Sequence, residues 1–496
     1  MGGVNAQQLS TCGNFCGADL SHTITSWAQD PTDLTYYKPP SSGDCSSTNV
    51  PYFDVHYKQN YCDKKGHTDQ YDACDPNECV LKIHVYYPTN NDYANCPLPA
   101  IILFHGGAYN ECGDYNDGGI VALGGDLASR GYVVFNVNYR VGVITDNRLV
   151  NNINEDNRDL TFVAAQQILA IYRAVQDARG AIRSIIKMNS DGTFNPIGSH
   201  PYKINTDQIF VGGVSAGSLI ALAACYFGDG TPGQNRFDAV CPGVRTAFSG
   251  TTPNLASLDP PNVYYANRAD LSFDFHTHVA GILNCWGSLF IPTANLSQPY
   301  DFYKGQGFLL PPIISFCGKL DPVFWYTHQG VYFSPYDANS SLQKNNEIRC
   351  VPQSSGYSVT ALTDINGDPV PNAYSIGSQD IYKMLHTPGG NNMPVLTEFY
   401  LDRQMYHGLD DDCVGCTANP MAGFTKQCDV CMGYFSNFGV AANTNEATTY
   451  EYIATRAATF FQTILGGDIS HISTTKFVEC ENNRLKCLGN TTTVCP

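Results

Sequence analysis

Short apolar runs of strand length recur along the chain and are separated by segments of helical period. Residues 81–88 alternate between apolar and polar, and 98–104 are almost continuously apolar, as in a buried strand. Residues 159–188 repeat apolar side chains at helical spacing along one face. This helix precedes the apolar run 209–211 in the chain and is expected to pack on the sheet. Another helix is predicted across 448–465.

A Gly-x-Ser-x-Gly pentapeptide follows the run 209–211 directly. Residues 213–217 read Gly-Val-Ser-Ala-Gly, and the small and apolar residues 218–224 predict a helix after them. A strand, this turn and a helix are the context of a nucleophile elbow, whose tight turn exposes the serine hydroxyl. The hypothesis is that Ser215 is a nucleophile and that the Ala216 N–H, at the helix start, meets an oxyanion. The alternative is a small-residue turn without chemistry.

A second glycine motif follows the strand predicted at 98–104. Residues 105–109 read His-Gly-Gly-Ala-Tyr. Glycines there let the backbone approach a ligand closely and direct bare N–H groups at it. Gly106 and Gly107 are therefore predicted to donate to the oxyanion together with Ala216. The alternative is a glycine turn that only ends a strand.

The two motifs together resemble those of α/β-hydrolases of the carboxylesterase and hormone-sensitive-lipase-like group. Residues 131–140 resemble the fourth strand of that group, and Asn-Cys-Trp-Gly at 284–287 resembles the strand after the elbow helix in some secreted bacterial esterases. The resemblance covers about 81–466 and implies an α/β fold, with a mostly parallel central sheet flanked by helices. Many relatives carry a third glycine where this chain has Ala108, so the identity of the third donor stays open.

The resemblance also implies where the acid of a catalytic triad stands. In this fold the chain order is Ser, then Asp or Glu, then His. The predicted strand 312–316 is followed by a Gly-x-x-Asp-Pro loop, and its Asp321 resembles the acid of relatives. An aspartate that starts a turn before proline is the structural alternative. Glu398 and Asp402, within and at the end of a later strand, are weaker candidates.

The base is expected after the last of these strands. Residues 396–401 alternate like a strand and are followed by a His-Gly pair, which makes His407 the predicted base. His328 and His386 also lie downstream of Ser215 and remain alternatives.

The expected mechanism is acyl transfer. His407 takes the proton of Ser215 as its oxygen attacks a carbonyl, and Asp321 orients the imidazole and stabilises its charged form. Water then cleaves the acyl-enzyme. This chemistry needs no metal or organic cofactor.

Composition narrows the range of partners. The chain has 496 residues, a net charge of −17 and no Lys/Arg cluster, which disfavours nucleic acid and anionic membranes as partners. No apolar run approaches membrane-spanning length. The expected partner is a small-molecule or polymeric ester, and the oligomeric state stays open.

Cysteine usage indicates an oxidising compartment. The twenty cysteines are many for a cytosolic enzyme and favour disulfides, so a secreted or periplasmic protein is expected. The first residues carry no apolar signal region, which suggests that a signal peptide has been removed. Cys413, Cys416, Cys428 and Cys431 form two Cys-x-x-Cys pairs separated by eleven residues, for which disulfides are favoured over a structural zinc site.

The expected organisation is one catalytic domain with additions. Residues 1–80 form a cysteine-rich N-terminal extension, 81–470 the catalytic domain, and 471–496 a cysteine-containing tail. Insertions are expected near 227–277 and 332–380, and the first is the candidate wall over the active site.

The leading hypothesis is a secreted serine hydrolase of carboxylic esters. Aryl, feruloyl, acetyl and polyester substrates all remain open. The 31 tyrosines and 25 phenylalanines suit an aryl site, but packing is their commoner use. A peptidase on the same fold and a non-catalytic binding protein are the alternatives.

Overall fold

The computed structural model describes the secondary-structure framework and the loops close to it. The described residues are 26–37, 81–89, 97–107, 109, 118–140, 160–195, 198–228, 236–241, 257–260, 264–272, 274–292, 295, 297–304, 309–318, 321, 328–330, 362–363, 369–370, 373–386, 395–402, 449–465, 476–481 and 486–487.

The described residues form a central eleven-stranded sheet in the order β1-β3-β5-β4-β6-β7-β9-β14-β15-β16, with β2 paired to β3. The pairs from β5 to β15 are parallel, and antiparallel pairs occur only towards the two edges. The strands are β1 (Trp27–Gln29), β2 (Leu34–Tyr37), β3 (Leu81–Pro88), β4 (Leu98–Phe104), β5 (Val133–Val137), β6 (Ile204–Val214), β7 (Val279–Cys285), β9 (Ile313–Gly318), β14 (Thr397–Asp402), β15 (Lys476–Glu481) and β16 (Lys486–Cys487).

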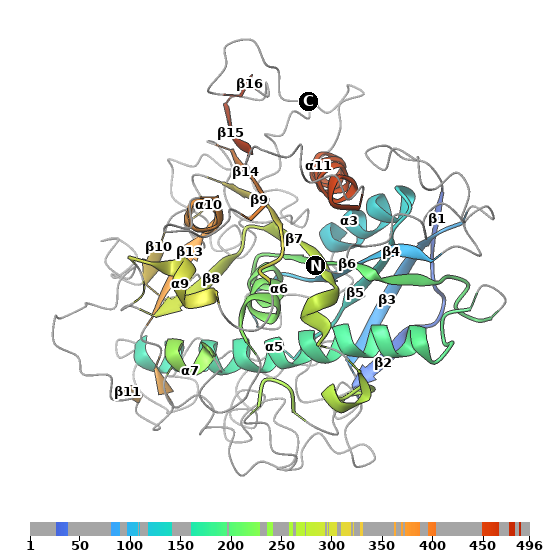
Figure 1. Cartoon of the computed structure of the whole chain (residues 1–496), viewed down its shortest axis with the longest axis horizontal. Helices are drawn as coiled ribbons and strands as arrows, with labels where there is room; N and C mark the ends of the chain where they lie inside the picture. Colours follow the sequence, from blue (N-terminus) through green and yellow to red (C-terminus); the bar gives the residue numbers. More distant parts are fainter. Residues whose placement is uncertain are drawn as a thin grey trace, which may run out of the picture.

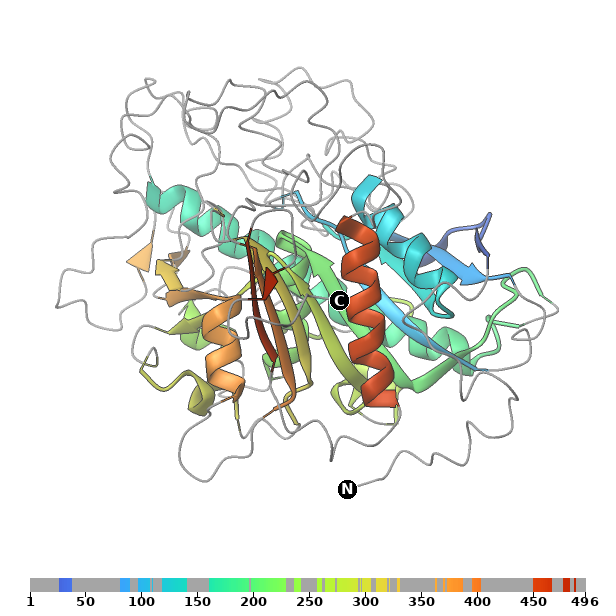
Figure 2. The same cartoon turned by 90° about the horizontal axis from the view of Figure 1, so that it is seen from above.

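Helices connect the parallel strands, because a parallel pair needs a crossover. The longest of them are α3 (Gly118–Ser129) before β5, α5 (Leu160–Ser190) before β6, α6 (Ala216–Tyr226) before β7 and α11 (Thr449–Leu465) before β15. Helices α5 and α6 pack on each other, as do α3 and α11. Figure 1 shows the long α5 on one side of the sheet and α3 with α11 on the other, and Figure 2 shows α11 alongside α3.

The direction of winding reverses beside β4. The chain moves from β4 to β5 on one side and then returns to β6 on the other side of β4. Right-handed crossovers in opposite directions put the connecting helices on opposite faces, which separates α3 from α5. Ligands of open α/β sheets bind beyond the carboxyl ends of the strands at such a reversal. The fold therefore indicates the ends of β4 and β6 as the place for a site.

Burial explains why the central elements are so apolar. Every residue of β4, β5 and α6 is buried. A ring pair joins the sheet to the outer helix, since Phe210 on β6 stacks on Phe461 of α11 with centroids 3.9 Å apart. Burying a side chain of this size contributes about 1.5–3 kcal/mol.

Smaller elements lie beside this sheet. A second sheet has the order β10-β13-β8, and β11 pairs with β12. These elements are β8 (Ser288–Pro292), β10 (His328–Gly330), β11 (Leu362–Thr363), β12 (Pro369–Val370), β13 (Ala373–Gly377), α7 (Arg236–Val240), η4 (Arg268–Asp270), η5 (Phe275–His278), α9 (Pro299–Tyr303) and α10 (Ser378–His386).

The α/β fold predicted from the resemblance is confirmed, as a mostly parallel sheet flanked by helices. The helix predicted at 159–188 is α5, and the one predicted at 448–465 is α11. Within the N-terminal extension, residues 26–37 form β1 and β2, which join the edge of the main sheet at β3. None of the helices in the described ranges combines the length and apolar character needed to cross a membrane.

Candidate active site

Ser215 occupies a strained turn between β6 and α6. Its φ is 54° and its ψ is −120°, a backbone conformation that is rare for a residue with a side chain. The Ser215 N–H donates to the carbonyl oxygen of Cys285 at 2.8 Å, which attaches the turn to the end of β7. The predicted strand, turn and helix are therefore present around this serine.

The two glycines of the pentapeptide are required by steric contact. A Cβ on Gly213 would lie 2.5 Å from the backbone carbon of Gly217, and a Cβ on Gly217 would lie 2.0 Å from the carbonyl oxygen of Phe104. Real Cβ atoms do not approach backbone atoms this closely, so both positions exclude any larger residue. Because Gly213 and Gly217 have no side chains, the turn can pack closely against the end of β4.

Ser218 and Asn284 reinforce the turn from below. The hydroxyl of Ser218 lies 2.9 Å from the carbonyl oxygen of Cys285, accepts from the Cys285 N–H at 2.8 Å and contacts the carbonyl oxygen of Gly213. The Asn284 amide donates to the hydroxyls of Ser315 on β9 and Ser378 on α10, each at 3.1 Å. These bonds join the ends of three neighbouring strands, and no motif in the sequence indicates them.

The His-Gly-Gly segment lies directly beside the serine. A Cβ built on Gly106 would be 3.4 Å from the carbonyl oxygen of Val214 and 3.5 Å from the Cβ of Ser215. Gly107 has a φ of 100°, in the region that favours glycine. The structure therefore places Gly106 close to Ser215 and its neighbour Ala216, whereas Ala108 lies outside the described residues.

Tyr139 orients the peptide groups of this segment. Its hydroxyl, at the end of β5, donates to the carbonyl oxygen of His105 at 2.9 Å and lies 3.2 Å from that of Gly106. The C=O and N–H of a trans peptide point in opposite directions. The N–H groups of Gly106 and Gly107 therefore point away from Tyr139.

His105 supports the same segment and is not placed as a catalytic base. Its ring stacks on Tyr139 with centroids 4.2 Å apart. Its Nδ1–H donates to the carbonyl oxygen of Gly106 at 2.8 Å, and its Nε2 lies 3.3 Å from the side-chain oxygen of Asn138. Stacking and the Nδ1 hydrogen bond therefore hold the ring against the loop.

Backbone strain gathers at this edge of the sheet. Among the described residues, the non-glycine residues with positive φ are Tyr109, Ser215 and Trp286. They follow the carboxyl ends of β4, β6 and β7, which are neighbours in the sheet. Each such conformation costs on the order of 1–3 kcal/mol, and such strain clusters at functional sites. The edge indicated by the strand order is therefore also the strained one.

Asp321 lies at the same edge, three residues beyond β9. Its backbone N–H donates to the carbonyl oxygen of Gly318 at 3.4 Å, and the residue is only 4% exposed. In the sheet, β9 is separated from β6 by β7 alone. A buried aspartate at the carboxyl edge fits the predicted acid.

Two of the alternative residues lie elsewhere. Glu398 is near the amino end of β14, where it accepts from Tyr400 at 2.7 Å and pairs with Arg456 at 3.6 Å. His386 is the last residue of α10. Its neighbour Leu385 accepts, at its carbonyl oxygen, the N–H of Val395 at 2.9 Å, so His386 lies close to the residues that lead into β14. Both residues are at the amino edge of the sheet, opposite Ser215.

The remaining candidates are His407, His328 and Asp402. His407 lies outside the described residues, so its role as base stays a prediction. His328 is on β10, outside the main sheet, with its Cα opposite that of Ile376. Asp402 ends β14, with its Cα opposite that of Gly318, and remains an alternative acid by position.

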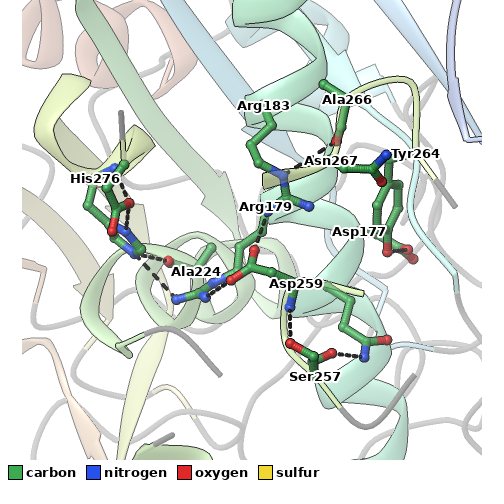
Figure 3. A network of polar contacts seen from close by, with 12 residues as sticks. Asp177, Arg179, Arg183, Ala224, Ser257, Asp259, Tyr264, Ala266, Asn267 and His276 are labelled. Atoms are coloured by element: carbon green, nitrogen blue, oxygen red, sulfur yellow. Dashed lines mark hydrogen bonds and ion pairs between the residues drawn. The ribbon is translucent and has the colours of Figure 1, made fainter. Parts of the chain in front are cut away.

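A buried network of charges lies away from the serine, at the other end of α6 (Figure 3). Asp259 pairs with Arg179 at 2.8 Å and with Arg183, both on α5. Burial opposes the ionisation of Asp259, but these two guanidinium groups outweigh it and lower its pKa. The Nε2 atom of His276 lies 3.3 Å from the guanidinium of Arg179 and 3.1 Å from the carbonyl oxygen of Ala224.

This network shows where part of the predicted insertion 227–277 lies. Its described residues 257–260 and 264–277, apart from residue 273, pack on α5 and on the C-terminal end of α6. Residues 229–235 and 242–256 of this insertion lie outside the described residues, so the expected wall over the active site stays a prediction.

The described ranges contain several cysteines and other side chains that can bind metals. Within them, no group of three or more His, Cys, Asp or Glu side chains is placed to hold a metal ion. Cys225 and Cys285 are buried free thiols, and burial raises the pKa of Cys225 to about 12. The six cysteines of 1–80 and the set Cys413, Cys416, Cys428 and Cys431 lie outside the described residues, so their disulfides stay a prediction.

Comparison with known proteins adds only distant likenesses. Neither a family model nor a curated protein matches the sequence. The apo form of Thermogutta terrifontis esterase 2 is 18% identical, with a TM-score of 0.27, and the match covers 50% of this chain and 70% of that one. Esterase B from Lactobacillus rhamnosis is 14% identical, with a TM-score of 0.25, and the match covers 64% of this chain and 72% of that one. The scores are low, and the fold assignment rests on the strand order and connections described above.

Proposed function

We propose that the protein is a secreted serine hydrolase that cleaves carboxylic esters with Ser215, His407 and Asp321. The observation that carries this proposal is the position of the strained Ser215, whose Cβ would lie 3.5 Å from a Cβ built on Gly106. A serine on a strand-to-helix turn, beside backbone N–H groups that lack side-chain cover, is the arrangement that acyl transfer needs.

The reaction follows from these positions. The Oγ of Ser215 attacks the ester carbonyl while His407 takes its proton and Asp321 stabilises the imidazolium. The N–H groups of Gly106, Gly107 and Ala216 receive the oxyanion. One such donor is worth about 3–4 kcal/mol in the transition state. The imidazolium then protonates the leaving alcohol, and water cleaves the acyl-enzyme with the same base.

The topology favours His407 as the base. Strand β14 is parallel to β9 and ends at the same edge, and His407 is five residues beyond its last residue, Asp402. Five extended residues span up to about 17 Å. The three strand spacings from β14 to β6 amount to about 14 Å, so the chain is long enough to bring the imidazole to Ser215.

Hydrolysis of 4-nitrophenyl acetate, longer acyl esters and feruloyl esters tests the proposal. The S215A, H407A and D321N variants are expected to lose several orders of magnitude in kcat with an unchanged fold. Ser190→Ala is the matched control, because this exposed serine stands at the end of α5 and donates to the carbonyl oxygen of Lys187. Full activity of S215A would contradict the proposal.

The same panel separates the alternatives. A peptidase on this fold would cleave 4-nitroanilides of amino acids or short peptides faster than the matching esters. A non-catalytic binding protein would turn over neither class. Feruloyl, acetyl and polyester substrates in parallel would identify the acyl and alcohol preference.

A further inference from the structure

Tyr109 combines a strained backbone with a buried hydrogen bond. Its φ is 64°, which is rare for a bulky aromatic residue, and its side chain is buried. The phenol hydroxyl donates to the carbonyl oxygen of Ala216 at 3.2 Å. The proposed reaction does not use this group, so its conformation needs another reason.

The hydrogen bond joins the two segments that carry the proposed oxyanion donors. Tyr109 comes two residues after Gly107, and Ala216 is the first residue of α6. The two bonded residues are 107 positions apart in the chain. The left-handed backbone at Tyr109 turns its ring back onto the helix that begins beside Ser215. The phenol thereby links the Gly106–Gly107 loop to the elbow.

The phenol is suited to a permanent role of this kind. Burial is the main reason that the pKa of Tyr109 lies well above its usual range, and the nearby Tyr139 adds to it. The hydroxyl therefore keeps its proton and remains a donor throughout the range in which a histidine base works. The contact is shielded from water, and a hydrogen bond is electrostatically stronger in such a buried environment than in water.

We propose that Tyr109 is a positioning residue that holds the Gly106–Gly107 loop at a set distance from Ala216, so that their three N–H groups meet one oxyanion. This inference rests on the proposed ester hydrolysis. The geometry matters most in the transition state, where the negative charge has developed. Loss of the phenol is therefore expected to lower kcat and to leave KM nearly unchanged.

The test compares Tyr109→Phe with Tyr226→Phe. Tyr226 is the matched control, because it is also buried and donates to a backbone carbonyl, that of Pro311 at 2.9 Å, from the far end of α6. With 4-nitrophenyl acetate, Y109F is expected to lower kcat roughly 3- to 10-fold, the effect of one lost hydrogen bond. Y226F is expected to keep kcat within about twofold even where it lowers Tm.

An arylboronic acid gives a second readout, since its tetrahedral adduct with serine places an oxygen in the oxyanion position. Its inhibition constant should rise in Y109F by the same factor as kcat falls. Tyr109→Asn removes the phenol with a residue that tolerates the left-handed backbone, and it should show the same losses. This second variant guards against misfolding caused by the phenylalanine itself.

The outcomes are distinguishable. An active wild type with unchanged kcat and boronate affinity in Y109F overturns the inference and leaves the proposed hydrolysis intact. Equal losses of kcat in Y109F and Y226F also overturn it, because the effect would then be general destabilisation. A wild type that hydrolyses no ester and binds no boronate overturns both proposals.

Discussion

The carbonyl oxygen of Cys285 accepts the N–H of Ser215 at 2.8 Å, and the N–H of Cys285 donates to the hydroxyl of Ser218 at 2.8 Å. One peptide segment at the end of β7 is therefore bonded to both sides of the serine turn. The turn is held by backbone packing and hydrogen bonds together, and both can be tested.

Substitution of Gly217 by alanine should damage the turn. Its Cβ would lie 2.0 Å from the carbonyl oxygen of Phe104, so either β4 or α6 must shift. We expect G217A to lower kcat by at least roughly tenfold, because displacement of the nucleophile by about 1 Å is costly. Thermal unfolding should shift to a lower Tm. Gly198→Ala is the control, since its Cβ makes an ordinary contact of 3.4 Å, and equal effects of the two variants would contradict this account.

Removal of the Tyr139 hydroxyl should misalign the glycine donors. The phenol holds the carbonyls of His105 and Gly106, and without it their peptide planes can rotate. We expect Y139F to lower kcat roughly 3- to 10-fold at constant KM, the range for one hydrogen bond. Steady-state kinetics beside Y226F as control give the measurement. A rise in KM with unchanged kcat would instead place Tyr139 in substrate binding.

Stability should fall as the pH drops below about 6.5, the pKa of an ordinary histidine. Burial and the nearby Arg179 lower the pKa of His276, although Asp274 and Asp259 act in the opposite direction. The unfolded chain therefore binds the proton first, and the free energy of unfolding decreases by up to about 1.4 kcal/mol per pH unit. The lowered pKa of Asp259 adds a further loss at more acidic pH, below the range of free carboxylates.

Urea unfolding between pH 7 and 5 checks this dependence. The H276Q variant is expected to flatten the slope, because its side chain takes up no proton. His278→Gln is the matched control, since it changes a histidine two residues further along and leaves His276 in place. The Nδ1 of His278 is bonded to the carbonyl oxygen of Thr206. A wild-type slope retained in H276Q would assign the proton uptake to another group.

The local parts of the site could be predicted from the sequence. Steric limits within one turn determine which residues can occupy positions 213, 215 and 217. The Gly-x-Ser-x-Gly pattern is therefore sufficient to predict the turn. Helix α5 was predictable from its apolar period. The same period does not indicate the partners of Arg179 and Arg183, which are buried and bonded to Asp259 and, for Arg183, to the carbonyl oxygen of Ala266.

The contacts between distant segments could not be predicted. The residues around Tyr109 and Tyr139 do not indicate the carbonyl groups to which these tyrosines donate. Those contacts depend on how β4, β5 and α6 pack together. The distinction between Asp321 and Glu398 likewise needs the direction of β9 and β14. Chain order alone allows both residues, whereas the strand ends separate them.

Residues 26–37 have a consequence for any attempt to produce residues 81–470 alone. Strand β3 bonds β5 on one side, and β1 and β2 cover its other side. A chain that starts at residue 81 would present that row of backbone donors and acceptors to the solvent, where a second molecule could add a strand. Such a truncated protein is expected to self-associate, and light scattering would reveal it as a concentration-dependent increase in mass.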